Sequence, residues 1–192
     1  MDKQTAQQVT DEIMGYYQNH GGEEYAGEKV TQLEHMVQAA ELAEQQGFDE
    51  EVVLAAFLHD IGHICNPGHG DNEMDGFGIK DHEEIGADFL KQKGFSKKIV
   101  RLVESHVEAK RYLTLKDPAY YDQLSDASKK TLEYQGGQMS EEEANAFEQY
   151  PLFDLIIKMR KWDEQAKIEH KPLPALVHYR KMILRHLESQ KN

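Results

Sequence analysis

The chain of 192 residues carries a formal net charge of −13 with its histidines neutral, so it would repel the phosphates of DNA or RNA. Its longest apolar runs are too short to cross a bilayer, and its first residues lack the apolar segment of a secretory signal. One cysteine leaves no internal disulfide. We therefore expect a single cytoplasmic domain over residues 1–192, with no nucleic-acid or membrane partner.

Helix signals begin close to the N-terminus. Apolar residues spaced three and four apart predict a helix over residues 4–19. Thr31 and Glu34 have the spacing of a capping box, which predicts a second helix from there through Gln46. This helix carries His35 in its first turn, so His35 is expected at a fixed position.

An apolar segment over residues 52–58 is the centre of the sequence, and it ends in His59, Asp60 and, shortly after, His63. Asp49 is expected to cap the helix that contains it. Because adjacent helical residues point about 100° apart, His59 can bind one metal ion while the Asp60 carboxylate reaches a second. A solvated helix C-terminus explains such a pair equally well, so further ligands are needed to decide.

Clustered glycines over residues 66–80 predict an irregular loop. After it, Asp81 and Glu84 have the spacing of a capping pair, which predicts a helix that continues to Lys93. His82 would occupy the first position of that helix, so it is a second histidine at a helix start.

Ser96 predicts the start of a helix over residues 97–112. His106 and Lys110 are four residues apart on this helix, so we expect their side chains to share one face.

Further helix signals fill the C-terminal part of the chain. They predict a short helix from Pro118, a helix over 125–135, a helix capped by Ser140 with Glu143, a helix after Pro151 that carries Arg160 and Asp163, and a last helix over 174–188. The sequence contains no alternating run of strand length. The predicted fold class is therefore all-α.

Six residues of metal-ligand type fall on these helices: His35, His59, Asp60, His82, His106 and Asp163. Each histidine taken alone is more often a surface or hydrogen-bonded core residue than a ligand. Their order is a histidine, a His-Asp pair, two spaced histidines and a late aspartate. This order resembles the H…HD…D pattern of the HD-domain superfamily with two added histidines, which implies a helical bundle with a dinuclear metal centre in its core.

Longer segments resemble one branch of that superfamily, the PhnZ-type phosphonate oxygenases. They are YAGE at 25–28, QLEH at 32–35, LHDIGH at 58–63, HVEAKRYL at 106–113, residues 124–137, WDE at 162–164 and HYRKM at 178–182. The resemblance implies an iron-dependent dioxygenase that cleaves the carbon–phosphorus bond of a small 1-hydroxy phosphonate with O2. The favoured substrate is (R)-2-amino-1-hydroxyethylphosphonate, which would give glycine and phosphate.

The resemblance also implies two iron ions in a mixed-valent Fe(II)/Fe(III) state. It places His35, His59, Asp60 and Asp163 on one iron and Asp60, His82 and His106 on the other, with Asp60 as the bridge. One iron would bind the substrate and the other O2. Imidazole and carboxylate ligands suit iron in both oxidation states.

Cationic and hydroxyl side chains near these ligands predict a phosphonate site. Lys110 and Arg160 each lie within one turn of a predicted ligand, so they would direct positive charge at an anion on the metals. Ser128 and Thr131 can add hydroxyl donors, and Gln135 can join them. Each of these residues alone is more often solvated or merely packed, and the family resemblance favours the pocket.

Tyr25, Glu28 and His63 are the expected catalytic residues and would also contact the substrate. The resemblance implies that Tyr25 occupies an iron position until substrate arrives, while Glu28 meets the substrate amine. His63 would face the substrate beside the ligands. The alternative for the loop that carries Tyr25 is an ordinary surface loop packed on the core.

Other functions remain open at this point. The same chemistry on the N-trimethylated substrate would give glycine betaine and phosphate, with Tyr120 or Tyr121 lining an aromatic cage. Glu28 favours the primary amine, because a primary ammonium can donate hydrogen bonds to a carboxylate. A binuclear HD-domain phosphohydrolase would use the same ligands with Mn or Mg to activate water. A non-catalytic HD module would not need the full ligand set.

Overall fold

The computed structural model describes residues 1–25, 27–65 and 73–190. These residues form helices and connecting segments without a strand, and their β pairings are isolated bridges between Glu24 and Thr31 and between Glu73 and Ile79. The prediction of an all-α fold is confirmed. None of the helices in these ranges combines the length and the apolar content that a membrane span requires.

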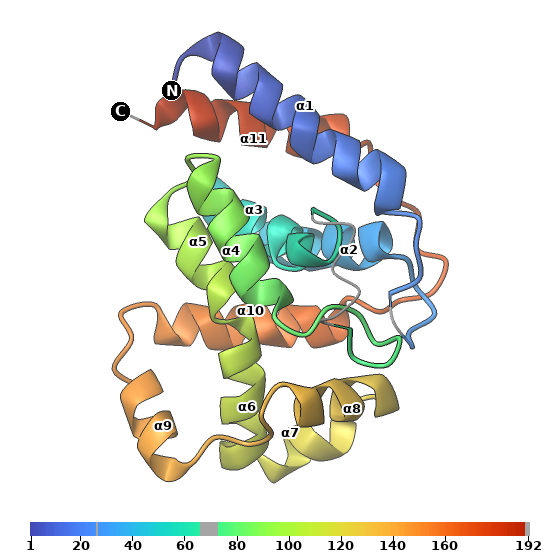
Figure 1. Cartoon of the computed structure of the whole chain (residues 1–192), viewed down its shortest axis with the longest axis vertical. Helices are drawn as coiled ribbons and strands as arrows, with labels where there is room; N and C mark the ends of the chain where they lie inside the picture. The colour runs from blue at the N-terminus through green and yellow to red at the C-terminus, as the bar shows by residue number, and fades with distance from the viewer. Residues whose placement is uncertain (26, 66–72, 191–192) are drawn as a thin grey trace.

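The helices follow the chain in the order shown in Figure 1. They are α1 (Lys3–His20), α2 (Gln32–Gln45), α3 (Glu50–Leu58), the 3-10 turn η1 (Ile61–His63), α4 (His82–Gln92), α5 (Lys97–Glu104), α6 (His106–Lys116), α7 (Pro118–Gln123), α8 (Asp126–Tyr134), α9 (Glu141–Phe147), α10 (Phe153–Gln165) and α11 (Val177–Ser189). The capping boxes predicted at Thr31 and Ser140 are both present. The side chains of Asp49 and Ser96 cap α3 and α5 as predicted, and Ser125 caps α8 at the start of the helix predicted over 125–135.

The segment predicted as one helix over residues 97–112 is two helices, α5 and α6, which are separated at Ser105. The His106 ring is bonded to the Val103 carbonyl at 2.7 Å. In a continuous helix the Val107 N–H would use that carbonyl, so the ring interrupts the hydrogen-bond ladder. The break lets α6 leave α5 and extend toward α7, α8 and α9 (Figure 1). His106 and Lys110 still share one helix.

The predicted capping pair of Asp81 and Glu84 is wrong, although α4 does begin at His82. Asp81 makes no side-chain capping bond to the helix, and its backbone has φ −106° and ψ 37°. An N-cap side chain reaches the first N–H groups from an extended backbone, which Asp81 lacks.

Helix α3 is the centre of the core, with every residue from 52 to 58 buried. The Phe57 ring stacks between the rings of Tyr17 and Tyr179, each with its centroid 4.5 Å away. The Tyr17 hydroxyl donates a hydrogen bond to the Phe57 carbonyl at 2.6 Å, which satisfies an acceptor that the end of α3 leaves open. Tyr17 of α1 and Tyr179 of α11 therefore fix the end of α3 that leads into His59 and Asp60.

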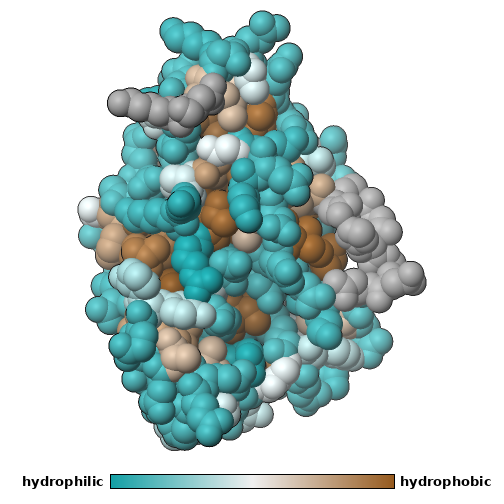
Figure 2. Space-filling view, turned by 60° about the vertical axis from the view of Figure 1, so that its left-hand side comes forward, coloured by the Kyte–Doolittle hydropathy of each residue, from teal (hydrophilic) through white to brown (hydrophobic). Residues whose placement is uncertain are grey.

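Gly62 lets η1 approach α4 closely. A Cβ atom at this position would lie 1.9 Å from the His82 carbonyl oxygen, so only glycine fits without moving the backbone. This contact brings Asp60 next to His82. On the face shown in Figure 2, hydrophilic residues predominate and the hydrophobic ones show mainly between them, in keeping with the high content of charged residues.

Candidate metal centre and active site

Four buried histidines direct their Nε2 atoms toward one centre because each ring is held through Nδ1. In each case Nδ1 is bonded to a backbone carbonyl: His35 to Ala166 (3.0 Å), His59 to Ala56 (2.8 Å), His82 to Ile79 (2.9 Å) and His106 to Val103 (2.7 Å). A carbonyl can only accept, so Nδ1 carries the hydrogen and donates. The Nε2 atom of each neutral ring therefore carries a lone pair that is available to a metal ion.

Asp60 lies between two pairs of these rings. Its Oδ2 atom is 3.4 Å from His35 Nε2 and 3.3 Å from His59 Nε2. Its Oδ1 atom is 3.2 Å from His82 Nε2 and 3.3 Å from His106 Nε2. Each carboxylate oxygen thus faces a different histidine pair, which is the arrangement of a bridging ligand.

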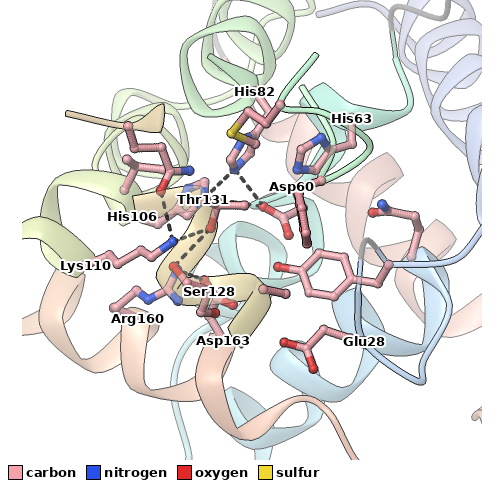
Figure 3. A pocket seen from close by; sticks show the side chains of 17 residues that line it. Glu28, Asp60, His63, His82, His106, Lys110, Ser128, Thr131, Arg160 and Asp163 are labelled. Carbon is pink, nitrogen blue, oxygen red and sulfur yellow. Dashed lines mark hydrogen bonds and ion pairs between the residues drawn. The ribbon is translucent and has the colours of Figure 1, made fainter. Parts of the chain in front are cut away.

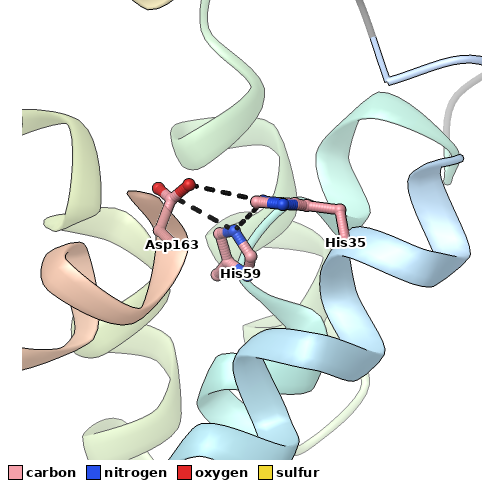
Figure 4. A group of neighbouring side chains, drawn as sticks. All are labelled: His35, His59 and Asp163. Carbon is pink, nitrogen blue, oxygen red and sulfur yellow. Dashed lines mark hydrogen bonds and ion pairs between the residues drawn. The ribbon is translucent and has the colours of Figure 1, made fainter. Parts of the chain in front are cut away.

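Asp163 on α10 completes the group around the first pair. Its Oδ1 atom is 3.3 Å from His35 Nε2, and its Oδ2 atom is 3.9 Å from His59 Nε2. Figure 4 shows these three side chains converging from α2, α10 and the end of α3.

The spacing of the donor atoms fits metal ions. The Nε2 atoms of His35 and His59 are 3.1 Å apart, and those of His82 and His106 are 3.0 Å apart. Two nitrogen ligands about 2.1 Å from one ion and at right angles to each other are separated by about 3 Å. Asp60 Oδ2 and Asp163 Oδ1 are also buried without a hydrogen bond among the described residues. The donors fit one ion held by His35, His59, Asp60 and Asp163 and another held by Asp60, His82 and His106.

Both carboxylates are ionised in this centre. Burial favours the neutral form of Asp60, but His59 and the other surrounding histidines hold its pKa well below the usual range. Burial of Asp163 is outweighed chiefly by the Arg160 charge, which lowers the pKa in the same way. Burial lowers the pKa of His35, yet Asp163 and Asp60 raise it to about 9 in the metal-free protein. These buried negative charges require cations, and a proton on His35 supplies one where no metal is bound.

His63 differs from the four histidines whose Nδ1 atoms donate to backbone carbonyls. Its Nδ1 accepts a hydrogen bond from the Ile79 N–H at 3.1 Å, so the neutral ring carries its hydrogen on Nε2. The ring stacks on His82 with centroids 4.0 Å apart, and burial together with the His82 charge lowers its pKa well below the usual range. His63 lies near enough to Asp60 and His82 to share an ion, but this tautomer makes it a hydrogen-bond donor beside the ligands.

Lys110 is a buried cation without a carboxylate partner in the described part of the chain. It is 2% exposed, and its Nζ donates to Thr131 Oγ1 at 2.6 Å and to Gln135 Oε1 at 3.0 Å. Burial and the Arg160 charge lower the pKa of Lys110 well below its usual range. An ammonium has three donors, so one N–H remains for an anion, whose charge would stabilise the protonated form.

Arg160 forms the wall of the cavity next to the first ligand group. Its Nη1 donates to Asp163 Oδ2 at 2.5 Å, its Nε donates to the Tyr120 hydroxyl at 2.9 Å, and its Nη2 pairs with Glu164. In Figure 3, Lys110 and Arg160 lie at one end of the cavity and Glu28 lies at the other. The cavity offers about 40 Å³ to water-sized molecules, so it suits a compact ligand.

Tyr25 covers the first ligand group. Its ring stacks on His35 with the centroids 3.9 Å apart and the planes inclined by 13°. Burial raises the pKa of the Tyr25 hydroxyl well above its usual range, and the negative charges of Asp60 and Asp163 add to this effect. The ring therefore covers His35, while Tyr25 itself lines the cavity.

Glu28 is already bonded inside the protein. Its Oε1 accepts from Ser125 Oγ at 2.5 Å and from Lys167 Nζ at 2.8 Å. Lys167 also donates to Ser128 Oγ at 3.2 Å and to Glu164 Oε2 at 3.2 Å. The sequence interpretation missed Lys167, which lies just beyond the end of α10 and meets Glu28 only through the tertiary fold.

The structure brings every predicted site residue to this cavity or to the ligand cluster behind it. Tyr120 and Tyr121 were considered for an aromatic cage and do not line it: Tyr120 borders a neighbouring groove, and Tyr121 is 39% exposed. From the predicted loop over residues 66–80, Phe77 does line the cavity. Residues 66–72, including His69, lie outside the described residues.

The helical fold, the His-Asp pair at the end of α3 and the late Asp163 define an HD-domain metalloprotein. The HD domain family matches residues 32–145 of the chain. The chain is 42% identical over 177 residues to [1-hydroxy-2-(trimethylamino)ethyl]phosphonate dioxygenase (glycine-betaine-forming) from Leisingera caerulea, with 92% of this chain and 89% of that protein covered.

Two further relatives have similar coverage. Hydroxymethylphosphonate dioxygenase from Gimesia maris is 38% identical over 181 residues, which is 93% of this chain and 88% of that protein. The uncharacterized protein L432 of Acanthamoeba polyphaga mimivirus is 44% identical over 180 residues, with 94% and 82% covered. The chain belongs to the HD-domain family and is an oxygenase of its PhnZ-like branch.

Proposed function

We propose that this oxygenase uses two iron ions and O2 to cleave the carbon–phosphorus bond of a small 1-hydroxy phosphonate. The observation that carries the proposal is the position of Asp60 between two histidine pairs, in a cavity that also contains the buried cation Lys110. A dinuclear centre and an anion site therefore share one cavity. Two relatives that bear the name phosphonate dioxygenase support the same reaction class.

The six ligands would bind iron in a mixed-valent Fe(II)/Fe(III) state, which supplies the activation of O2 and the removal of hydrogen from C1. The carbonyl bonds to Nδ1 keep each imidazole in the ligating tautomer and fix its direction. Asp60 would hold both ions at a fixed separation, because its two oxygens face different histidine pairs.

The phosphonate would lie at the end of the cavity that contains Lys110 and Arg160. Thr131 bonds the Lys110 Nζ atom and so aims its remaining N–H at the ligand. Ser128 can donate its hydroxyl hydrogen, because its Oγ already accepts from Lys167. Arg160 contributes positive charge while it holds Asp163 in place.

The carbon end of the substrate would face Tyr25, Glu28 and His63. His63 can donate from Nε2 to a substrate oxygen, and it holds this tautomer through the Ile79 N–H. Tyr25 would cover the ligand cluster before substrate binds and move aside afterwards, which limits reaction with O2 in the absence of substrate.

We propose two substrates for this site. With (R)-2-amino-1-hydroxyethylphosphonate, one O2 converts the substrate to glycine and phosphate, and the atoms balance. With the N-trimethylated analogue, the products would be glycine betaine and phosphate. Glu28 does not select the primary amine by itself because Lys167 already pairs with it. Phe77, which lines the same cavity, would offer an aromatic contact to the trimethylammonium.

The decisive experiment measures phosphate release from both phosphonates by iron-loaded protein, with and without O2. The proposal expects release only when iron and O2 are both present, and the ratio of kcat/KM identifies the preferred amine. Release without O2 in the presence of Mn or Mg would favour the binuclear phosphohydrolase instead. Absence of bound metal after expression in iron-replete cells would favour a non-catalytic HD module.

We also propose that residues 1–192 act as one domain in the cytoplasm. The only cysteine, Cys65, is buried and free, so the fold does not depend on an oxidising compartment. Cell fractionation of the tagged protein tests this location.

A further inference from the structure

Lys167 lies behind the end of the cavity where Glu28 would meet the carbon end of the substrate, and it contacts two lining residues, Glu28 and Ser128. Its ammonium is shared among Glu28 Oε1 at 2.8 Å, Ser128 Oγ at 3.2 Å and Glu164 Oε2 at 3.2 Å. The Lys167 and Glu28 side chains are 15% and 13% exposed. Water therefore screens this ion pair less than it screens a pair on the surface.

Ser125 holds Glu28 independently of Lys167. The Ser125 hydroxyl donates to Glu28 Oε1 at 2.5 Å from the start of α8. Lys167 also has a second carboxylate partner in Glu164, which pairs with Arg160 as well. Glu28 can therefore keep its position, and Lys167 can keep a counter-charge, if a ligand takes over the contact between them.

We propose that Lys167 determines substrate selectivity by competing with a cationic substituent of the phosphonate for Glu28. This inference rests on the proposed function of the same cavity. A substrate ammonium meets a carboxylate that Lys167 already neutralises, so the pair lowers the gain from binding that charge. A phosphonate without an amine leaves the Glu28–Lys167 pair intact. Both charges of the pair then remain compensated. Lys167 thus keeps hydroxyphosphonates that have no ammonium group within the substrate class.

The test compares Lys167→Met, which keeps the aliphatic stem and removes the charge, with the wild-type protein. Calorimetry on the metal-loaded proteins measures the binding of 2-aminoethylphosphonate and of n-propylphosphonate, in which a methyl group replaces the ammonium. The preference for the ammonium ligand should rise by about tenfold in Lys167→Met, because a hydrogen bond to a charged group is removed from Glu28. The ratio of kcat/KM for 2-amino-1-hydroxyethylphosphonate and hydroxymethylphosphonate should rise in parallel.

Three variants control the result. Lys171→Met removes a lysine that pairs with Glu41 at 2.6 Å outside the cavity, and it should keep the wild-type preference. Lys167→Arg retains the positive charge and should also keep the wild-type preference. In a Glu28→Gln background, Lys167→Met should no longer raise the preference, because the carboxylate at issue is gone.

An unchanged preference in Lys167→Met, or a rise that persists in the Glu28→Gln background, overturns the inference. If Lys167→Met loses metal, Lys167→Gln replaces it under the same criteria, since glutamine can still donate to Ser128. Binding separates this inference from the proposed function. A tenfold shift in the binding preference without carbon–phosphorus cleavage supports the role of Lys167 and refutes the proposed reaction. Cleavage with an unchanged binding preference supports the reaction and refutes the role of Lys167.

Discussion

The metal-binding side and the substrate side of the cavity are held in different ways. Each histidine ligand is tied to a backbone carbonyl, so it can move only if a helix or its adjoining segment moves. Among the described residues, the side chains of Lys110, Glu28 and Lys167 are held by other side chains, which can exchange partners. The metal side is therefore preorganised for one task, while the substrate side can change its specificity without disturbing the ligands.

The largest effect is expected from Asp60→Asn, which changes the metal side of the cavity at the residue that both ligand groups share. The amide keeps the shape of the carboxylate but replaces one oxygen with an NH2 group and loses the charge, so one ion would lose its Asp60 ligand and both would lose the bridging charge. Metal content per chain should fall by more than about half, and kcat/KM should fall by at least about 1000-fold. Elemental analysis and O2-dependent phosphate release measure this, with Asp154→Asn in the exposed first turn of α10 as the control. Full metal content in Asp60→Asn would refute the bridging role.

The next largest effect is expected from Lys110→Met, which changes the substrate side of the cavity. Because Lys110 is buried without a carboxylate partner in the described residues, methionine should leave the stability of the ligand-free protein unchanged or raise it by about 1 kcal/mol. The kcat/KM for the phosphonate should nevertheless fall by about 100-fold at full metal content, since the anion loses its buried cation.

Urea unfolding and steady-state kinetics test these two effects of Lys110→Met separately. Lys116→Met, on the same helix and paired with Glu141 at 2.5 Å, is the matched control and should change neither quantity by much. Unchanged kinetics in Lys110→Met would remove this residue from the substrate site.

The same contrast explains what the sequence could predict. Helix bounds follow from local signals, so the capping boxes at Thr31 and Ser140 were predictable. The break at Ser105 was not, because it depends on the ring of His106 and not on a helix-breaking residue. The grouping of the ligands came from the resemblance to a family. Lys167 was missed because its contact with Glu28 joins residues 139 positions apart, and no local pattern encodes such a pair.

A smaller effect is expected from Gln38→Leu, which loosens the backbone that holds one ligand. The buried Gln38 side chain bonds the Ile168 carbonyl at 3.0 Å and the Ile168 N–H at 2.9 Å. These bonds hold the neighbouring Ala166 carbonyl against the ring of His35. Removing them should weaken metal binding by about tenfold and change the His35 Nδ1–H signal in NMR spectra.

Gln7→Leu removes a comparable amide contact, a 2.8 Å bond to Asp11 on the exposed face of α1, and should leave metal affinity unchanged. Equal affinities in the two variants would show that Gln38 does not position His35.

The smallest effect is a pH dependence of the metal-free protein. His35 has a pKa of about 9 when folded and metal-free, which is above the ordinary histidine value of 6.5. A raised folded pKa stabilises the protein fully below pH 6.5, and this contribution is lost as the pH rises through 9. The loss should be of the order of 1 to 3 kcal/mol, seen as a fall of several degrees in Tm. Metal affinity should rise over the same window, because binding must displace the His35 proton. Tm measurements between pH 6 and pH 9.5 test this: His35→Gln should remove the slope, His20→Gln should keep it, and a flat wild-type profile would contradict it.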